Sequence, residues 1–374
     1  GNLMSFDEIK CQDRAIGLLR KALAAERVAH AWIFAGKDGV GREKTAFEFG
    51  KTLLCANPVY KSDAPESCGI CESCRLCGAG SHPDLNLIYK ELREYTENGK
   101  GKAPPVEVPI DVIREFLIDK AYTSPVAAER KIFVVKEAEK LNHFSQNALL
   151  KVLEEPPEFC TIILLCTRLE QLLPTTRSRC QIVNFGPVSE EYIRARLTES
   201  GSVSGEAGTY LSRFAEGSLG EALHLAGLEK AGAEVYELKK RLIKQLVRAD
   251  YSDALSFAGQ LVEEVKKVSG IWCDMEESAS KKDIARRTRK LIIRVFMTVL
   301  RDLMRLSVSD EGNLVNSDQI NEMRSLASRW DQDIVAAHVG IVAESFSWVD
   351  SSVNEKLIFE RLLLKLTDSG TMQV

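Results

Sequence analysis

Five cysteines lie close together in the first quarter of the sequence, at spacings that suit a metal ion. Cys55 stands a short stretch upstream of a tight run formed by Cys68, Cys71, Cys74 and Cys77. Two cysteines separated by two residues can direct both thiolates to one tetrahedral ion at about 2.3 Å, and a second such step completes the ligand set. Without a secretory leader, clustered cysteines indicate a metal rather than disulfides, with a redox pair as the alternative. We expect one structural Zn²⁺, held by Cys68, Cys71, Cys74 and either Cys55 or Cys77.

A glycine-rich turn between a predicted strand and a predicted helix has the outline of a phosphate-binding loop. Such a loop reads G-x-x-x-x-G-K-[ST]; its backbone N–H groups cradle phosphates, its lysine neutralises them and its hydroxyl holds Mg²⁺. Gly36, Gly39 and Gly41 fit the turn, but Arg42 stands at the lysine position and Glu43 at the hydroxyl position. Arginine is longer and planar, and a carboxylate repels phosphate oxygens. The loop keeps its shape and loses the groups that would bind MgATP.

The strand predicted over residues 131–135 ends without a metal-binding carboxylate. A hydrolysing site needs Asp followed by Glu at this point, the first to coordinate Mg²⁺ and the second to activate water. The sequence has Lys136 and Glu137 instead, and an ammonium group cannot ligate Mg²⁺. Because this change is independent of Glu43, we expect no ATP hydrolysis and no bound ATP.

The composition is that of an ordinary globular protein. Its 374 residues include 50 Lys and Arg against 54 Asp and Glu, with 45% apolar and 28% charged residues, which excludes wholesale disorder. No run approaches the ~20 apolar residues needed to cross a bilayer, and residues 1–4 lack the pattern of a secretory signal. We expect a cytoplasmic location and no membrane partner. The mild acidity argues against a surface that grips nucleic acid throughout.

Strands and helices alternate over the first half of the chain. Continuous apolar runs separated by helical segments predict a parallel sheet covered on both faces; the strand candidates are residues 31–35, 85–89, 131–135, 161–166 and 181–185. The cysteine cluster falls between the first helix after the glycine turn and the second strand, so it is an excursion from this domain. Residues 94–108 are rich in Gly and Pro and predict an exposed loop of unassigned role.

The strand pattern stops after Pro187, where a short helical segment begins. From Glu229 onward the sequence reads as long amphipathic helices. We therefore predict an α/β domain over 1–187, with the metal module at about 55–77, a small all-α domain over 188–228 and a larger all-α domain over 229–374. A basic run over Lys281–Arg294 is typical of a solvated helix face; contact with DNA or with another subunit is the alternative.

Several segments resemble bacterial DNA polymerase III clamp-loader subunits. The resemblance rests on residues 30–36, the cysteine cluster followed by 82–84, residues 147–157, residues 173–180 and residues 353–357. Ser178-Arg179-Cys180 is similar to the motif shared by this family and its eukaryotic replication factor C relatives. The resemblance covers most of the chain and is weakest between about Glu229 and Ser352.

The resemblance implies an AAA+ α/β domain, a helical lid and a helical collar that joins a hetero-pentameric ring. In the family, gamma/tau subunits bind the ATP that opens the sliding clamp and places it on primed DNA, with delta as a further partner. A degraded phosphate loop beside an intact Ser178-Arg179 implies a non-hydrolysing member whose Arg179 reaches a neighbour's ATP. The family's variable cysteine spacing favours Cys55 over Cys77. Its ATP-sensing arginine would fall where the sequence has Gly220, and its polar sensor at Thr167.

Two other functions are compatible with these residues. One is an active gamma/tau-like clamp-loader ATPase with a variant phosphate loop, which the residues at positions 42, 43, 136 and 220 oppose. The other is a zinc-dependent nucleic-acid module. Glu66 and Glu72 flank the cysteines with only Arg75 as a positive charge, which opposes this second function.

Overall fold

The computed structural model of the chain describes residues 5–61, 63–100, 105–201, 203–276, 279–308, 311–351 and 353–368. The chain forms two compact units. We call Gly1–Ser189 with Gly217–Gly220 the sheet unit, and Glu190–Glu216 with Glu221–Val374 the helical unit.

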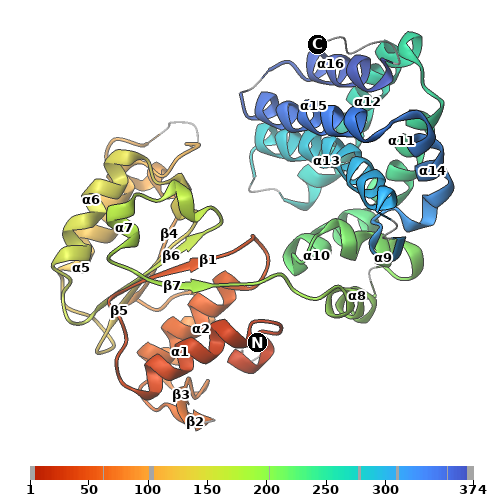
Figure 1. Cartoon of the computed structure of the whole chain (residues 1–374). Coiled ribbons are helices and arrows are strands. Elements are labelled where there is room, and N and C mark those ends of the chain that lie inside the picture. Colours follow the sequence, from red (N-terminus) through yellow and green to blue (C-terminus); the bar gives the residue numbers. More distant parts are fainter. Residues whose placement is uncertain are drawn as a thin grey trace. The chain divides into compact units, whose positions relative to one another are not determined.

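A five-stranded parallel sheet forms the centre of the sheet unit (Figure 1). Its strands run in the order β4-β5-β6-β1-β7, and all neighbours are parallel. The bounds are β1 Ala31–Ala35, β4 Leu85–Ile88, β5 Lys131–Val135, β6 Cys160–Cys166 and β7 Gln181–Asn184. The predicted parallel sheet is confirmed. Each strand lies within a residue of its predicted bounds.

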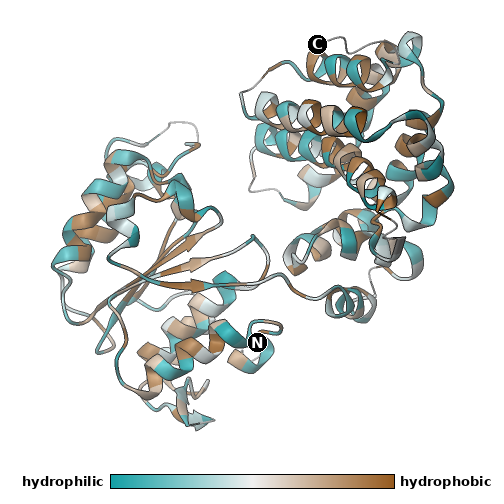
Figure 2. Ribbon diagram, viewed as in Figure 1, coloured by the Kyte–Doolittle hydropathy of each residue, from teal (hydrophilic) through white to brown (hydrophobic). Residues whose placement is uncertain are grey.

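Alternate side chains of β1 pack against different helices. Ile33 belongs to the core that includes Leu149 of α6, whereas the Trp32 ring lies 5.4 Å from the Phe49 ring of α2. Helices therefore cover both faces of the sheet (Figure 1), which explains why β1, β5 and β6 are buried throughout and mostly apolar (Figure 2). The helices of this unit are α1 Asp13–Ala24, α2 Arg42–Leu54, α3 Glu72–Gly78, α4 Ile110–Ile113, α5 Asp119–Ala121, α6 His143–Glu154 and α7 Pro174–Arg177.

The excursion between α2 and β4 contains a short antiparallel hairpin followed by α3. Strand β2 spans Val59–Lys61 and strand β3 spans Ala64–Glu66. The described residues of the segment predicted as an exposed loop include regular and buried parts. A 3₁₀ turn, η2, spans Lys90–Tyr95, and buried Val108 bridges to Leu141. Residues 101–104 of that predicted loop lie outside the described residues.

The helical unit has no strand among its described residues. Its α-helices are α8 Glu190–Glu199, α9 Gly205–Phe214, α10 Leu219–Leu228, α11 Val235–Arg248, α12 Ala254–Met275, α13 Lys281–Ser307, α14 Ile320–Arg329, α15 Gln332–Asp350 and α16 Glu355–Thr367. Ser280 starts α13 by accepting a hydrogen bond from the Asp283 N–H. Over the described ranges, none of the helices combines the length and the apolar character needed to cross a membrane. The division at residues 187 and 228 into three domains remains a prediction.

Candidate functional site

Four of the five clustered cysteines converge on one point of the sheet unit. The sulfur atoms of Cys55, Cys68, Cys71 and Cys74 all lie within 4.8 Å of one another. Cys55 Sγ is 3.6 Å from Cys68 Sγ and 3.8 Å from Cys71 Sγ. Thiolates bound at about 2.3 Å to a tetrahedral ion lie about 3.8 Å apart. The four sulfurs therefore fit a metal ion, and Cys77 is not among them.

The local backbone directs these sulfur atoms inward. The N–H groups of Cys68, Cys71 and Cys74 donate to the sulfurs of Cys55, Cys68 and Cys71, at 3.3, 3.3 and 3.4 Å. Burial raises the pKa of Cys71, but N–H groups of Cys74 and Ala56 outweigh this effect and lower the pKa to about 6. Such donors stabilise the thiolate form that binds metals. Cys77 is fully buried, and burial raises its pKa to about 12.

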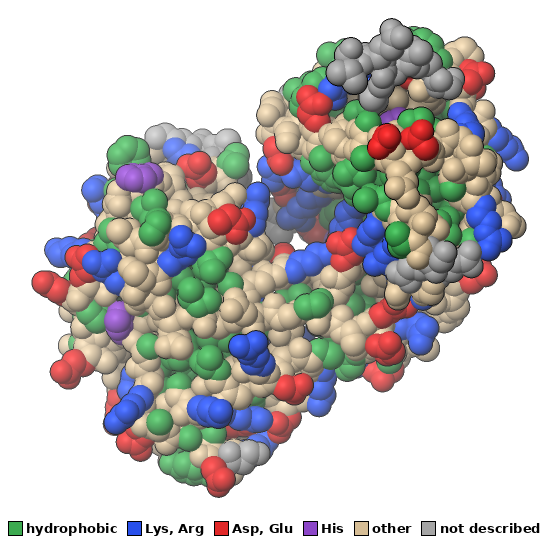
Figure 3. Space-filling view, viewed as in Figure 1, with side chains coloured by type: hydrophobic (Ala, Val, Ile, Leu, Met, Phe, Trp, Pro, Cys, Tyr) green, Lys and Arg blue, Asp and Glu red, His purple; other side chains and the backbone are tan. Residues whose placement is uncertain are grey.

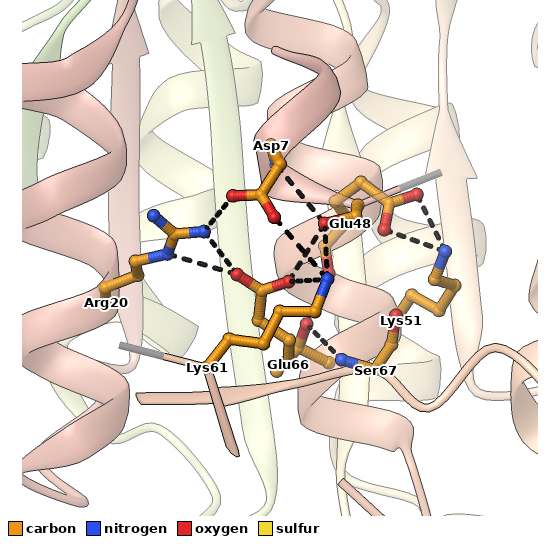
Figure 4. A network of polar contacts seen from close by, with 9 residues as sticks. Asp7, Arg20, Glu48, Lys51, Lys61, Glu66 and Ser67 are labelled. Carbon is orange, nitrogen blue, oxygen red and sulfur yellow. Dashed lines mark hydrogen bonds and ion pairs between the residues drawn. The ribbon is translucent and has the colours of Figure 1, made fainter. Parts of the chain in front are cut away.

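Polar contacts fix the hairpin that connects Cys55 to Cys68 (Figure 4). Buried Glu66 of β3 accepts two hydrogen bonds from Arg20 of α1, and Arg20 also pairs with Asp7 at 2.7 Å. The Ser67 N–H donates to Thr52 Oγ1 at 3.3 Å. Thr52 lies shortly before Cys55, and Ser67 lies directly before Cys68. This hydrogen bond therefore fixes the distance between the two chain segments that carry Cys55 and Cys68. None of these partners carries a signal in the sequence pattern.

The glycine turn forms the strand–loop–helix expected of a phosphate loop. Gly41 precedes the first residue of α2, and Gly39 has φ +75°. A Cβ atom on Gly39 would lie 2.3 Å from Ser218 Oγ and 3.0 Å from Gly220 N, so only glycine fits here without displacement. The turn is thus covered by residues 217–220 of the same unit.

Gly220, which stands where the family resemblance places an ATP-sensing arginine, is one of the residues that pack against the glycine turn. The Gly220 N–H donates to the Gly39 carbonyl at 3.0 Å, and a Cβ atom on Gly220 would lie 2.9 Å from Gly39 Cα. A longer side chain at this position would force the two backbones apart.

Arg42, at the position of the phosphate-binding lysine, is turned into the protein. Its side chain is only 7% exposed, and Nη2 donates to Asp38 at 3.4 Å. Its Nε and Nη1 atoms are buried and make no hydrogen bond within the described residues.

The residues at the two metal-binding positions bind each other. Lys136 Nζ, directly after β5, lies 2.5 Å from Glu43 Oε1 in the first turn of α2. In a hydrolysing site, a hydroxyl and a carboxylate at these places would both coordinate Mg²⁺. Here an ammonium and a carboxylate pair with each other instead; an ammonium cannot ligate Mg²⁺, and a carboxylate repels phosphate oxygens.

Two further polar residues, Glu137 near the end of β5 and Thr167 directly after β6, also form ion pairs or hydrogen bonds. Burial raises the pKa of Glu137, but ion pairs with Lys140 and Lys90 outweigh it and leave the pKa lowered. A carboxylate with a lowered pKa is a weaker base toward water. Thr167, at the sensor position, donates both its N–H and its hydroxyl to Glu139.

Arg179 lies partly exposed on the sheet unit, directly after α7. Its Nη2 is 2.7 Å from Glu154 Oε1 at the end of α6, and its Nη1 donates to the Thr175 carbonyl at 3.0 Å. The Arg179 side chain is 35% exposed. From the sequence alone, Glu154 is only a polar residue on the face of a helix. Its ion pair with Arg179 becomes visible in the structure.

The basic run at the start of α13 is largely neutralised. Arg286 and Arg287 pair with Asp283, and Lys290 pairs with Asp350 at 2.6 Å. Acidic and basic side chains also alternate over the visible face of each unit (Figure 3). This pattern favours a solvated face over a nucleic-acid contact.

Comparisons with known proteins assign the chain to a family. The family described as "DNA polymerase III, delta subunit" matches residues 11–189, and that described as "DNA polymerase III, delta subunit, C terminal" matches residues 281–368. The delta-prime subunit of Bacillus subtilis DNA polymerase III is 23% identical over 359 residues, covering 96% of both chains. The chain belongs to the DNA polymerase III delta-prime family.

Two further relatives of this delta-prime family member are informative. The Pseudomonas aeruginosa delta-prime subunit is 31% identical over 228 residues, which is 59% of this chain and 63% of that protein. The Escherichia coli tau subunit is 29% identical over 264 residues, which is 69% of this chain and 38% of that protein. The predicted resemblance to clamp-loader subunits is confirmed, and so is a parallel α/β fold followed by helices.

Proposed function

We propose that this clamp-loader subunit does not hydrolyse ATP and works on the ATP of a neighbouring subunit. The observation that carries the proposal is the ion pair between Glu43 and Lys136. The pair consists of a lysine and a glutamate where a hydrolysing site has an Mg²⁺-binding carboxylate and hydroxyl, so the loop lacks the groups that hold MgATP. Buried Arg42 and the glycine contact at Gly220 support the same conclusion.

Within the proposed function, the partners are the gamma/tau and delta subunits of a hetero-pentameric ring. Subunits named delta-prime and tau are among the relatives of the chain. Together with them the chain would help to open the sliding clamp and load it on primed DNA. Its own contribution to ATP hydrolysis is Arg179, assisted by Ser178, which is supplied in trans.

The proposed metal is Zn²⁺ in a structural role. Four thiolates from Cys55, Cys68, Cys71 and Cys74 fill the tetrahedral preference of this ion and leave no open position for a substrate. When bound, the ion would crosslink the end of α2, the hairpin and α3. Zinc and the thiolates would then stabilise a short excursion that has few apolar contacts of its own.

An active gamma/tau-like ATPase with a variant loop is the alternative. It requires that Arg42 leave its buried position and that Lys136 release Glu43 when MgATP binds. The present contacts of both side chains favour the non-hydrolysing function.

Arg179→Ala in a reconstituted ring tests the in-trans role. An arginine supplied across an interface typically contributes about 10³–10⁵ in rate at its own site. The variant should assemble normally and lower the clamp- and DNA-stimulated ATPase only in part, because other sites keep their own arginines. Arg179→Lys should restore little activity, since a point charge does not reproduce the planar guanidinium.

Arg168→Ala is the matched control, because Arg168 is an exposed arginine of the same unit. It should leave assembly and ATPase unchanged. If Arg179→Ala assembles and the ATPase and clamp-loading rates equal those of the wild type, the in-trans role is wrong.

A further inference from the structure

The contact between Arg179 and Glu154 gives the trans-acting arginine a partner on its own subunit. Glu154 is the last residue of α6, and its carboxylate lies 2.7 Å from Arg179 Nη2. The Thr175 carbonyl holds Nη1 at 3.0 Å. Both terminal nitrogens of the guanidinium are therefore engaged within the chain, and one of them faces a negative charge.

Glu154 is poorly placed for the stability of its own helix. The C-terminus of an α-helix carries partial negative charge, so an acidic residue in the last turn is unfavourable. Glu155 adds a second carboxylate directly after the helix. Lys151 in the last turn of α6 and Arg179 both offset this charge, but only Arg179 brings the Ser178-Arg179-Cys180 segment to the end of the helix.

The charge of Glu154 also affects what Arg179 can do for a neighbour. An arginine acts on phosphoryl transfer through its positive charge, and an adjacent carboxylate cancels part of that charge. Arg179 must therefore exchange Glu154 for phosphate oxygens before it is effective. The Glu154 and Arg179 side chains are 50% and 35% exposed, and ion pairs this exposed bias an equilibrium by only about fivefold. A triphosphate carries several negative charges and can therefore displace Glu154 from the Arg179 guanidinium. Water carries no charge and leaves the pair in place.

We propose that Glu154 is a positioning residue that holds Arg179 on its own subunit until a neighbour's ATP displaces it. This inference rests on the proposed in-trans role of Arg179. Under this proposal, Arg179 leaves Glu154 only when a neighbouring subunit that carries ATP comes close. The ring would then hydrolyse little ATP at this interface before the clamp and DNA bring the subunits together.

Glu154→Gln in the reconstituted ring tests the proposal, because glutamine keeps the size and the acceptor oxygen but removes the charge. ATPase of the ring without clamp and DNA should rise by about twofold, because a gain of about fivefold applies to one of several sites; the stimulated rate should change less, so the ratio of the two rates falls. In an Arg179→Ala background the same substitution should have no effect. Glu155→Gln, an exposed neighbour, is the matched control and should leave both rates unchanged.

The outcomes separate the two proposals. If Arg179→Ala lowers the stimulated rate while Glu154→Gln leaves the ratio unchanged or raises it, the positioning role of Glu154 is wrong and the in-trans role stands. An effect of Glu154→Gln that persists without Arg179 also overturns the positioning role. If Arg179→Ala itself changes nothing in an assembled ring, the in-trans role fails first.

Discussion

Replacing Cys55 by serine removes one of the four converging sulfur atoms and should weaken zinc binding strongly. Structural zinc sites bind with about 10–16 kcal/mol at neutral pH. If the four ligands contribute equally, each accounts for about 2.5–4 kcal/mol, which corresponds to a loss of about 10²–10³ in affinity. The serine hydroxyl can still accept the hydrogen bond that the Cys68 N–H now donates to Cys55 Sγ at 3.3 Å, so the variant tests the metal ligand more than the local backbone contact.

The assay is competition for zinc between the protein and a chelator of known affinity, followed by thermal unfolding of the loaded and stripped forms. Cys77→Ala is the matched control, because Cys77 is equally close in sequence but lies outside the sulfur cluster. It should keep its zinc and lose about 1 kcal/mol of stability to the small cavity left in a buried site. Zinc lost from Cys77→Ala and retained by Cys55→Ser would refute the assignment of the ligands.

Two further predictions concern stability. Burial lowers the pKa of His338 to about 4, so the unfolded chain binds a proton more readily than the folded chain. The free energy of unfolding should therefore fall by about 3 kcal/mol as the pH drops from about 6.5 to 4. In urea unfolding curves, His338→Gln should reduce this dependence of stability on pH. Gly39→Ala should destabilise the sheet unit by about 2–4 kcal/mol, from a positive φ and a Cβ atom 2.3 Å from Ser218 Oγ. Gly17→Ala, inside α1 with nothing within 4 Å, should instead add up to about 1 kcal/mol, and equal effects of the two glycine substitutions would contradict the packing described for the turn.

The three central strands of the sheet, β5, β6 and β1, were predictable because each is a mostly apolar run between helices. The β2–β3 hairpin was not, since Val59–Lys61 and Ala64–Glu66 are short, and the first of these strands is exposed along its whole length. A strand held by polar contacts and neighbouring ligands has no period of buried residues that a sequence pattern could reveal.

The functional residues also include some that the sequence predicts and some that only the fold reveals. Local spacing is enough to select Cys68, Cys71 and Cys74, whereas the choice between Cys55 and Cys77 depends on the path of the hairpin. The ion pair of Glu43 with Lys136 joins two elements that are far apart in the sequence. Sequence alone predicts that neither residue suits hydrolysis, but their pairing depends on the folding of α2 against the sheet.

The measurement that tests the central claim most directly is calorimetric titration of the zinc-loaded chain, alone, with MgATP. The contacts of Arg42, Glu43 and Lys136 predict no saturable binding heat at ATP concentrations that saturate ordinary phosphate loops. A saturable heat with a micromolar Kd would contradict the account, because it would show that this loop binds nucleotide despite the ion pair at its metal-binding positions.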